Sequence, residues 1–112
     1  MLSTTACVLL AEECEFALLR SIGASELEHR IIRVHFETQH LRPALYEDPV
    51  TMHITVNRVG TSSIHYDFTI FSRGAVASTG RWGDVHLGET GRPSPIPAHL
   101  RAALLTTGDQ HG

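Results

Sequence analysis

The chain contains no lysine, because all nine of its basic side chains are arginines. This absence excludes a Schiff-base lysine and a P-loop lysine. The arginines form no block and the formal net charge is −3, so we expect no nucleic-acid partner. The longest apolar run, Ala6 to Ala11, is much shorter than the roughly 20 residues of a membrane span. We therefore expect no association with a membrane.

Cysteine is also scarce, since the chain has only Cys7 and Cys14. Both belong to one apolar pattern of helical period, which favours reduced, buried side chains over a disulfide framework. We predict a cytoplasmic protein without a cofactor. Its 112 residues, 42% of them apolar, suffice for one domain, residues 1–112, but leave little interior for an enclosed cleft. A pocket shared between subunits is therefore favoured.

Hydrophobic periodicity predicts one long helix followed by strands. Apolar residues recur at the 3.6-residue period over about residues 4–22, with Ser3, Thr4 or Thr5 as the cap and Gly23 as the stop. Alternation with period two predicts strands at about 29–37, 49–57, 62–71 and 75–87, and a short helix follows at about 98–105. The long helix is apolar on several sides, which predicts burial on several sides by a sheet that wraps it. This describes an α+β hot-dog arrangement.

Turn residues and alternation predict how the strands pair and face. A turn at residues 57–61 places His53 opposite His65, and Gly74 suits a three-residue loop that requires a positive φ. The sheet is therefore expected to be mainly antiparallel. In the first strand, alternation places Ile32 and Val34 on the buried face.

Eight histidines raise the question of a metal site. His35, His53 and His65 fall on the polar faces of the expected strands. No HExxH, CxxC or facial-triad spacing accompanies them. We therefore expect no bound metal.

Four stretches carry a family pattern. They are residues 10–23 (LAEECEFALLRSIG), 41–50 (LRPALYEDPV), 58–63 (RVGTSS) and 89–97 (ETGRPSPIP). In this order and spacing they resemble the hot-dog thioesterases of the 4-hydroxybenzoyl-CoA thioesterase type, over about residues 7–105. The resemblance implies an antiparallel sheet around one central N-terminal helix, and hydrolysis of acyl-CoA or acyl-carrier-protein thioesters.

The resemblance also implies where a catalytic carboxylate lies. Members of this type usually begin with a further strand and a loop like D-x-D-x-x-G-H-V-N-N that carries an aspartate, and Ser3 to Thr5 stand here in place of its asparagines. A second branch places the acid on the helix, in a pattern like H-G-G-A-x-x-x-L-A-E, which this chain follows from Ala6 onward. That pattern implies Glu12 as general base or nucleophile, with Glu13 in reserve. An apolar surround near Phe16 would make Glu12 a better base.

Thioester hydrolysis also requires N–H donors for the developing oxyanion. We expect them at Thr5, Ala6 and Cys7, because amides at a helix start lack intrahelical acceptors and lie at the positive end of the dipole. The resemblance implies that Ser62 and Ser63 line the acyl pocket, whereas the sequence alone favours a plain hairpin-turn role. Candidates for binding the CoA phosphates are Arg42, Arg58, Arg81 and Arg92.

The leading interpretation is a homodimer or a dimer of dimers with thioester pockets at the subunit interface. Three alternatives stay open. The first is a non-catalytic protein of the same fold that binds acyl thioesters or another ligand. The second is a small cyclase or dehydratase on a related α+β scaffold, although the short Asp/Glu and His motif of hot-dog hydratases is not found. The third places the true start upstream of Met1, with the missing strand and loop before it.

Overall fold

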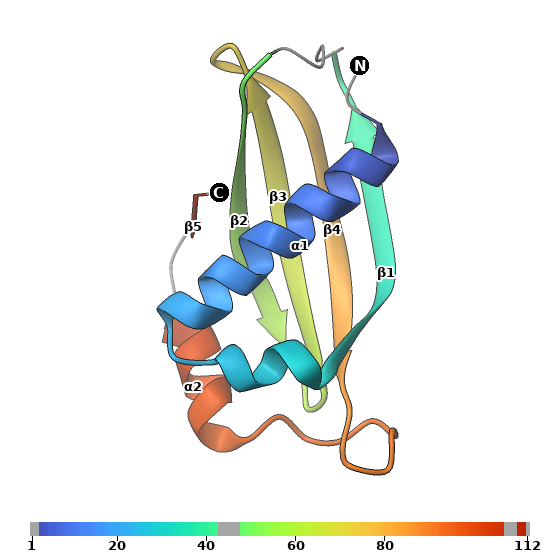
Figure 1. Cartoon of the computed structure of the whole chain (residues 1–112), viewed down its shortest axis with the longest axis vertical. Coiled ribbons are helices and arrows are strands. Elements are labelled where there is room, and N and C mark those ends of the chain that lie inside the picture. The colour runs from blue at the N-terminus through green and yellow to red at the C-terminus, as the bar shows by residue number, and fades with distance from the viewer. Residues whose placement is uncertain (1–2, 43–47, 107–109, 112) are drawn as a thin grey trace.

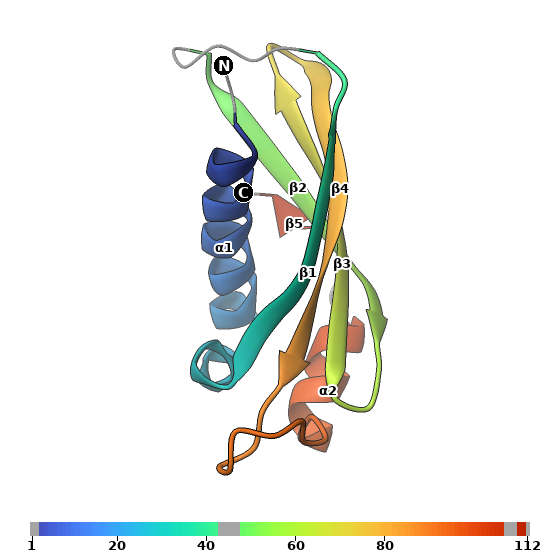
Figure 2. The ribbon, with the colours of Figure 1, turned by 90° about the vertical axis from the view of Figure 1, so that its right-hand side faces the viewer.

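The chain folds around one antiparallel sheet with a long helix across one face (Figures 1 and 2). The computed structural model describes residues 3–42, 48–106 and 110–111. The elements are α1 (Thr4–Ser21), the 3-10 helix η1 (Ser25–His29), β1 (Ile31–His40), β2 (Val50–Val59), β3 (Ser63–Ser72), β4 (Ala75–His86), α2 (Ala98–Thr106) and β5 (Gln110–His111). The strand order is β1-β4-β3-β2-β5. The predicted α+β class is confirmed, whereas residues 43–47 of one family stretch lie outside the described part.

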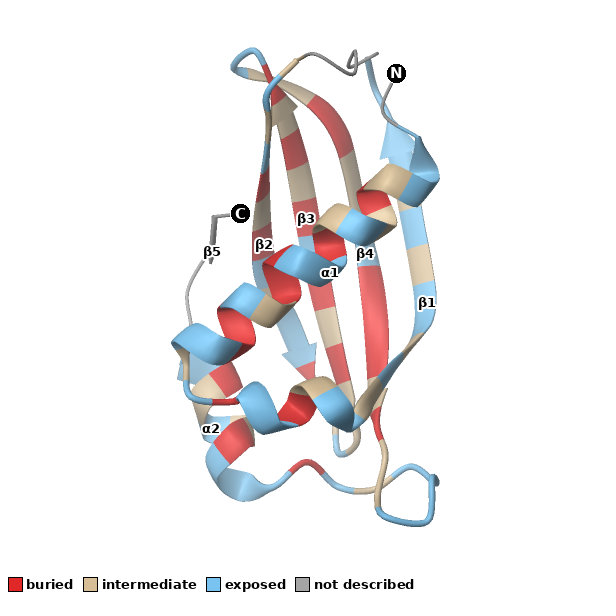
Figure 3. Cartoon of the chain, viewed as in Figure 1, coloured by how far each residue is buried: buried red, intermediate tan, exposed pale blue. Residues whose placement is uncertain are grey.

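Helix α1 buries one face against the sheet. Ser3 caps it, since its Oγ accepts a hydrogen bond from the N–H of Ala6 at 3.1 Å, and Gly23 follows its end with a left-handed φ of 75°. The buried residues are Cys7, Ala11, Cys14, Glu15, Leu18 and Leu19. The predicted burial on several sides is wrong for the single chain, because the sheet covers only one side of the helix (Figure 3). Leu9, on the uncovered side, is 59% exposed.

Strand β1 forms an edge of the sheet, and its side chains switch between the two faces of the sheet partway along the strand. Its register against β4 shifts between Arg33 and His35, which marks a β-bulge. The bulge leaves Ile32 and Val34 49% and 58% exposed, while Phe36 packs inward against the core. The predicted inward position of Ile32 and Val34 is wrong, because a bulge breaks the period-two alternation on which it depended.

Strands β2 and β3 form a hairpin in a register that differs from the predicted one. His53 lies opposite Thr69, four residues beyond His65, and His65 lies opposite Arg58. The predicted pair of histidines is therefore wrong. The turn falls at residues 60–62 because β2 continues to Val59 with a bulge near its end. The main shift is an even number of residues, so the side chains keep their predicted faces.

The turn between β3 and β4 has two residues rather than the predicted three, since Ser72 pairs with Ala75. Arg73 and Gly74 both have left-handed φ values, 53° and 76°, as a type I′ turn requires. Gly80 lies in the middle of β4. A Cβ atom there would clash with the carbonyl oxygen of Glu37 and the ring of Phe68, so the glycine permits a close approach by β1.

Aromatic rings fill much of the space between α1 and the sheet. Tyr66 and Trp82 stack with ring centroids 4.7 Å apart, and Phe36 and Phe68 stack at 5.5 Å. Full burial of an apolar side chain stabilises the fold by about 1.5–3 kcal/mol. These residues therefore anchor the three adjacent strands β1, β4 and β3 to one core.

Helix α2 packs against β2 at the lower end of the sheet in Figure 1. Leu100 and Leu104 are its buried residues. Arg101 donates hydrogen bonds to the carbonyl oxygens of Val59, at 2.9 Å, and Gly60, which ties α2 to the end of β2. Among the described helices, none is both long and apolar enough to cross a membrane.

Candidate functional site

The start of α1 lies beside the end of β1 (Figure 1), and the sequence predicts the oxyanion site here. Ser3 already engages two of the three predicted donors. Its Oγ binds the N–H of Ala6 at 3.1 Å, and its carbonyl oxygen binds the N–H of Cys7 at 3.0 Å. The N–H of Thr5 has no acceptor among the residues that the structure describes. Of the three, Thr5 is thus the donor that a ligand can use without displacing the cap.

His40 connects the helix start to the sheet, although no sequence pattern predicted a role for it. Its Nδ1 lies 2.9 Å from Oγ of Ser78 on β4, and its Nε2 lies 3.4 Å from Oγ1 of Thr4. Ser78 is 1% exposed, whereas the histidine is exposed. Its partners are 38 and 36 residues away in the chain, so no local pattern reveals them. The only sequence signal is its place just before the family stretch at residues 41–50.

Glu12 and Glu13 lie on the face of α1 that points away from the sheet, and both are exposed. The apolar surround expected for Glu12 is wrong for the single chain, because Phe16 is only partly buried and nothing in the described residues covers this face. Arg20, near the end of the same helix, pairs with Glu28 at 2.8 Å. The catalytic roles of the two glutamates stay predictions, and any cover over them must come from another molecule.

Ser62 lies in the β2–β3 turn and Ser63 begins β3, at the opposite end of the sheet from the helix start (Figure 1). The carbonyl oxygen of Ser62 accepts the N–H of His86 at 2.7 Å, and that of Ser63 accepts the N–H of Gly60 at 2.8 Å. These backbone contacts fit the hairpin-turn role. Within one chain, the structure does not bring the two serines together with Thr5.

The four candidate CoA-binding arginines are all exposed and are spread over the molecule. Arg42 follows β1 at the end that carries the helix start, and Arg92 lies in the loop after β4. Arg58 and Arg81 line one hollow of about 220 Å³. Only these two are brought together by the fold.

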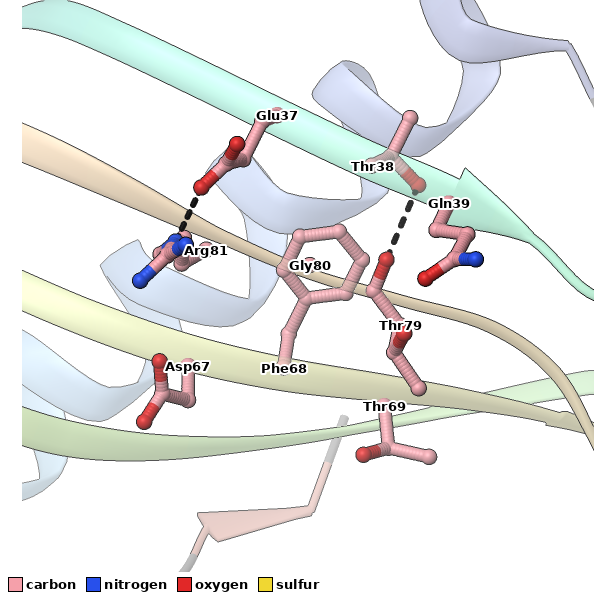
Figure 4. Close-up of a pocket in the computed structure, with 9 residues that line it drawn as sticks. All are labelled: Glu37, Thr38, Gln39, Asp67, Phe68, Thr69, Thr79, Gly80 and Arg81. Atoms are coloured by element: carbon pink, nitrogen blue, oxygen red, sulfur yellow. Dashed lines mark hydrogen bonds and ion pairs between the residues drawn. The ribbon is translucent and has the colours of Figure 1, made fainter.

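A larger hollow of about 450 Å³ lies on the face of the sheet opposite α1 (Figure 4). Its charged groups are already engaged: Glu37 pairs with Arg81, and Asp67 accepts a hydrogen bond from Nδ2 of Asn57 at 2.8 Å. The hydrogen bond from Arg81 lowers the pKa of Glu37, so this carboxylate is a weaker base than an ordinary glutamate. The hollow is polar and open, but its glutamate, Glu37, is poorly suited to accept a proton.

A charged cluster lies buried between α1 and the sheet, where no sequence pattern predicted a site. It joins Glu15 of α1, Arg33 of β1 and Asp84 of β4. Arg33 Nη2 lies 3.3 Å from Glu15 Oε1, and its Nε lies 3.9 Å from Asp84 Oδ1. The exposed side-chain fractions are 3% for the glutamate, 2% for the aspartate and 19% for the arginine. Two acids and one guanidinium therefore share a nearly dry space.

Tyr66 and Trp82 close this cluster on the sheet side. Burial, reinforced by the charges of Glu15 and Asp84, raises the pKa of Tyr66 well above 10. The guanidinium of Arg33 lies 5.0 Å from the centre of the Trp82 ring, within cation–π range. Burial, and then the hydrogen bond and charge of Glu15, raise the pKa of Asp84 from 3.8 to about 9. The shifted acid, Asp84, and its neighbour Glu15 are only 2% and 3% exposed, so a substrate in solution cannot reach either carboxyl group in this structure.

Neither a metal site nor a reactive cysteine is indicated in the described ranges. No group of three or more His, Cys, Asp or Glu residues there is arranged to hold a metal ion. Cys7 and Cys14 are free and buried. Burial raises the pKa of Cys14 to about 11, so its thiolate is disfavoured as a nucleophile.

Two comparisons with known proteins agree with each other, because both the family models and the solved structures show similarity to thioesterases. A model of the thioesterase superfamily matches residues 4–77. A predicted thioesterase from Bacillus stearothermophilus has a TM-score of 0.78 and 25% identity, with 92% of this chain and 80% of that chain covered. A Thermus thermophilus thioesterase complexed with coenzyme A and Zn has a TM-score of 0.71 and 25% identity, with 87% and 75% covered. A gentisyl-coenzyme A thioesterase has a TM-score of 0.79 and 20% identity, with 91% of this chain and 85% of that chain covered.

The curated proteins include no match to this chain. The solved structures nevertheless share its antiparallel sheet and long N-terminal helix, so the hot-dog fold that the sequence predicts is confirmed.

Proposed function

Because the chain belongs to the thioesterase superfamily, we propose that it hydrolyses the thioester bond of an acyl-coenzyme A. Thioester hydrolysis is the general activity that the family and the solved relatives support. Coenzyme A is favoured as the carrier because the Thermus relative was solved with it, and an acyl-carrier protein is the alternative. A cytoplasmic location stays a prediction.

The observation that carries the proposal is the open start of α1. The N–H of Thr5 has no acceptor among the described residues and lies at the positive end of the helix dipole, where a developing oxyanion is stabilised. A thioester carbonyl oxygen placed there is polarised for attack. Glu12 lies on the same exposed face, and it would either take a proton from the attacking water or attack the carbonyl carbon itself.

One helix cannot supply both groups to one carbonyl carbon. Thr5 and Glu12 are seven positions apart, which is about 10 Å along an α-helix. We infer that Glu12 of the partner subunit faces the Thr5 N–H of the first. Such an arrangement also explains why the outward face of α1 is uncovered in the single chain.

The edge strand β1 is our candidate for the subunit contact. It pairs with β4 on one side and with no other described strand. Ile32, Val34 and Leu41 on and after this strand are 49%, 58% and 52% exposed. Exposed apolar edge strands pair readily with other chains, and two-fold pairing is the commonest symmetry of homodimers. Val34→Lys should therefore yield monomers in light scattering, whereas Thr51→Lys on the exposed β2 surface should not. An unchanged mass for both variants would reject this interface.

The direct test is thiol release from a panel of acyl-CoA thioesters by the purified protein. We expect turnover by the wild type, since the proposed site is exposed and partly pre-formed. The absence of turnover with every acyl-CoA and acyl-carrier-protein substrate would reject hydrolysis.

Binding without hydrolysis is the second candidate function. The exposure of both Glu12 and Glu13 in the single chain favours it, because neither carboxylate is desolvated. Calorimetric titration with a non-hydrolysable acyl-CoA thioether distinguishes the two. Binding together with thiol release supports the enzyme, whereas binding alone supports the ligand-binding protein.

A further inference from the structure

The cluster beneath α1 contains an unusual concentration of unpartnered polar atoms. In the described residues, the buried side-chain atoms without a hydrogen-bond partner include Glu15 Oε2, Arg33 Nε, Tyr66 OH, Trp82 Nε1 and Asp84 Oδ2. Leaving one such atom unpaired costs about 1–3 kcal/mol. Three of these atoms belong to groups that donate. The other two, Glu15 Oε2 and Asp84 Oδ2, are acceptors on neighbouring carboxyl groups, so an element that joins them is missing when both acids are ionised.

A proton is the simplest missing element. Two ionised carboxylates are acceptors only, so Glu15 and Asp84 cannot bond to each other. Glu15 and Asp84 lie within side-chain hydrogen-bond reach of each other, so one proton on either group makes it a donor to the other. It also balances the charge, because one carboxylate then faces the single guanidinium of Arg33. With both acids ionised, residues only 2% and 1% exposed would carry an uncompensated negative charge, which is costly in a dry interior.

We propose that Glu15 and Asp84 form a proton-binding pair, which holds one proton at neutral pH and fastens α1 to β4. The proton belongs to the pair rather than to either residue. Arg33 completes the fastening from β1, since its guanidinium contacts Glu15 at 3.3 Å and donates to the carbonyl oxygen of Val8 at 3.4 Å. The pair and Arg33 together join three elements, α1, β4 and β1.

The neighbouring titratable groups do not compete for this role. Cys14 on α1 and Tyr66 on β3 have pKa values raised by burial, to about 11 and to well above 10. Both therefore stay neutral in the range where the pair loses its proton. Arg33 on β1 stays charged throughout. Strand β2 faces this region with Met52, which is apolar and buried.

The pair gives a defined dependence of stability on pH. Burial and Glu15 raise the pKa of Asp84 from 3.8 to about 9 in the folded protein, whereas the unfolded chain keeps the ordinary value. Between about pH 4 and pH 9 the folded state therefore binds one more proton than the unfolded state. This contribution to stability is complete at low pH and is lost as the pH rises through this window, by about tenfold in the unfolding equilibrium per pH unit.

Amide substitutions test the pair, because an amide resembles a carboxylic acid that keeps its proton. We expect Asp84→Asn to fold. Between pH 6 and 8.5, the unfolding constant of the wild type in urea should rise with each pH unit by a factor about ten times larger than that of Asp84→Asn. Glu15→Gln should behave in the same way. The double variant should unfold at least tenfold more readily than either single variant, because Arg33 then has no counter-charge. Asp67→Asn, on the exposed outer face of the sheet, is the matched control and should keep the wild-type slope.

Each other outcome overturns the proposal. Equal slopes for the wild type and Asp84→Asn would show that no extra proton is bound. A stable double variant would show that both acids are protonated. If the single variants do not fold, the infrared spectrum of the wild type decides, since a protonated carboxyl band must be present at pH 7 and must diminish toward pH 10. Because these readouts measure protons and folding, they are independent of whether the protein hydrolyses thioesters.

Discussion

Glu12 and Glu15 lie on the same helix, less than one turn apart, and the structure places them in opposite environments. Glu12 is exposed on the outer face, whereas Glu15 is 2% exposed between the helix and the sheet. The outer carboxylate is free to meet a substrate or a second subunit. The inner one pairs with Arg33, which also faces Asp84. Position around the helix, rather than residue type, therefore separates the proposed chemistry from the fastening of the helix.

The largest expected effect concerns the inner region. Arg33→Met leaves Glu15 and Asp84 buried without a cation, which should cost about 3–5 kcal/mol of unfolding free energy. Urea denaturation at pH 7 measures it. The matched control is Arg20→Met, since Arg20 is 65% exposed in its pair with Glu28, and such pairs contribute below about 1 kcal/mol. Equal losses in both variants would erase the distinction between the two regions.

The next effect concerns the outer region. Glu12→Gln should lower kcat/KM for a turned-over acyl-CoA by about 10²–10⁴-fold, the usual contribution of a general base. Its urea midpoint should not move, because the side chain is exposed. Glu13→Gln is the adjacent control with the same charge change. If Glu13→Gln shows the larger loss of kcat/KM, the catalytic carboxylate is Glu13 and not Glu12.

A smaller effect is expected at the helix start. Ser3→Ala removes the side-chain cap from the N–H of Ala6 and should reduce the free energy of unfolding by about 1 kcal/mol. Ser21→Ala serves as the control, because Ser21 Oγ donates to the carbonyl oxygen of Leu18 at the other end of α1. A midpoint unchanged by Ser3→Ala would mean that the cap does not hold the oxyanion site in place.

The smallest effect is expected from the candidate phosphate contacts. Arg42 lies at the end of the molecule that carries the helix start, whereas Arg92 lies in the loop at the other end. Arg42→Ala should raise KM for acyl-CoA by about two- to fivefold, as an exposed ion pair of up to about 1 kcal/mol implies. Arg92→Ala should leave KM closer to the wild-type value. The reverse order would place the coenzyme at the opposite end of the sheet.

Local periodicity was sufficient to predict the outer framework of the fold. The helix from Thr4, the two hairpins and the final helix were each predicted to within a few residues, because their patterns are contained in short segments. Bulges were not predictable in this way. The shift after Arg33 exposes Val34, and it depends on how β1 meets β4 rather than on the residues of β1 alone.

The candidate site likewise has a part that the sequence could predict and a part that it could not. Thr5 at the helix start could be predicted, because every α-helix begins with unpaired amides. The pair of Glu15 and Asp84 could not, since a helical glutamate is usually solvated and the partner lies on the last long strand. His40 was missed for a similar reason, because Ser78 and Thr4 approach it only after the sheet and the helix pack together.

The comparison of Glu12 and Glu15 is tested most directly by thiol release measured at pH 7 with Glu12→Gln and Asp84→Asn side by side. We predict that Asp84→Asn retains the turnover of the wild type, because it preserves the hydrogen bond to Glu15, whereas Glu12→Gln loses at least about 10²-fold. Turnover that survives in Glu12→Gln and disappears in a folded Asp84→Asn would contradict this assignment and place the reacting carboxylate inside the protein.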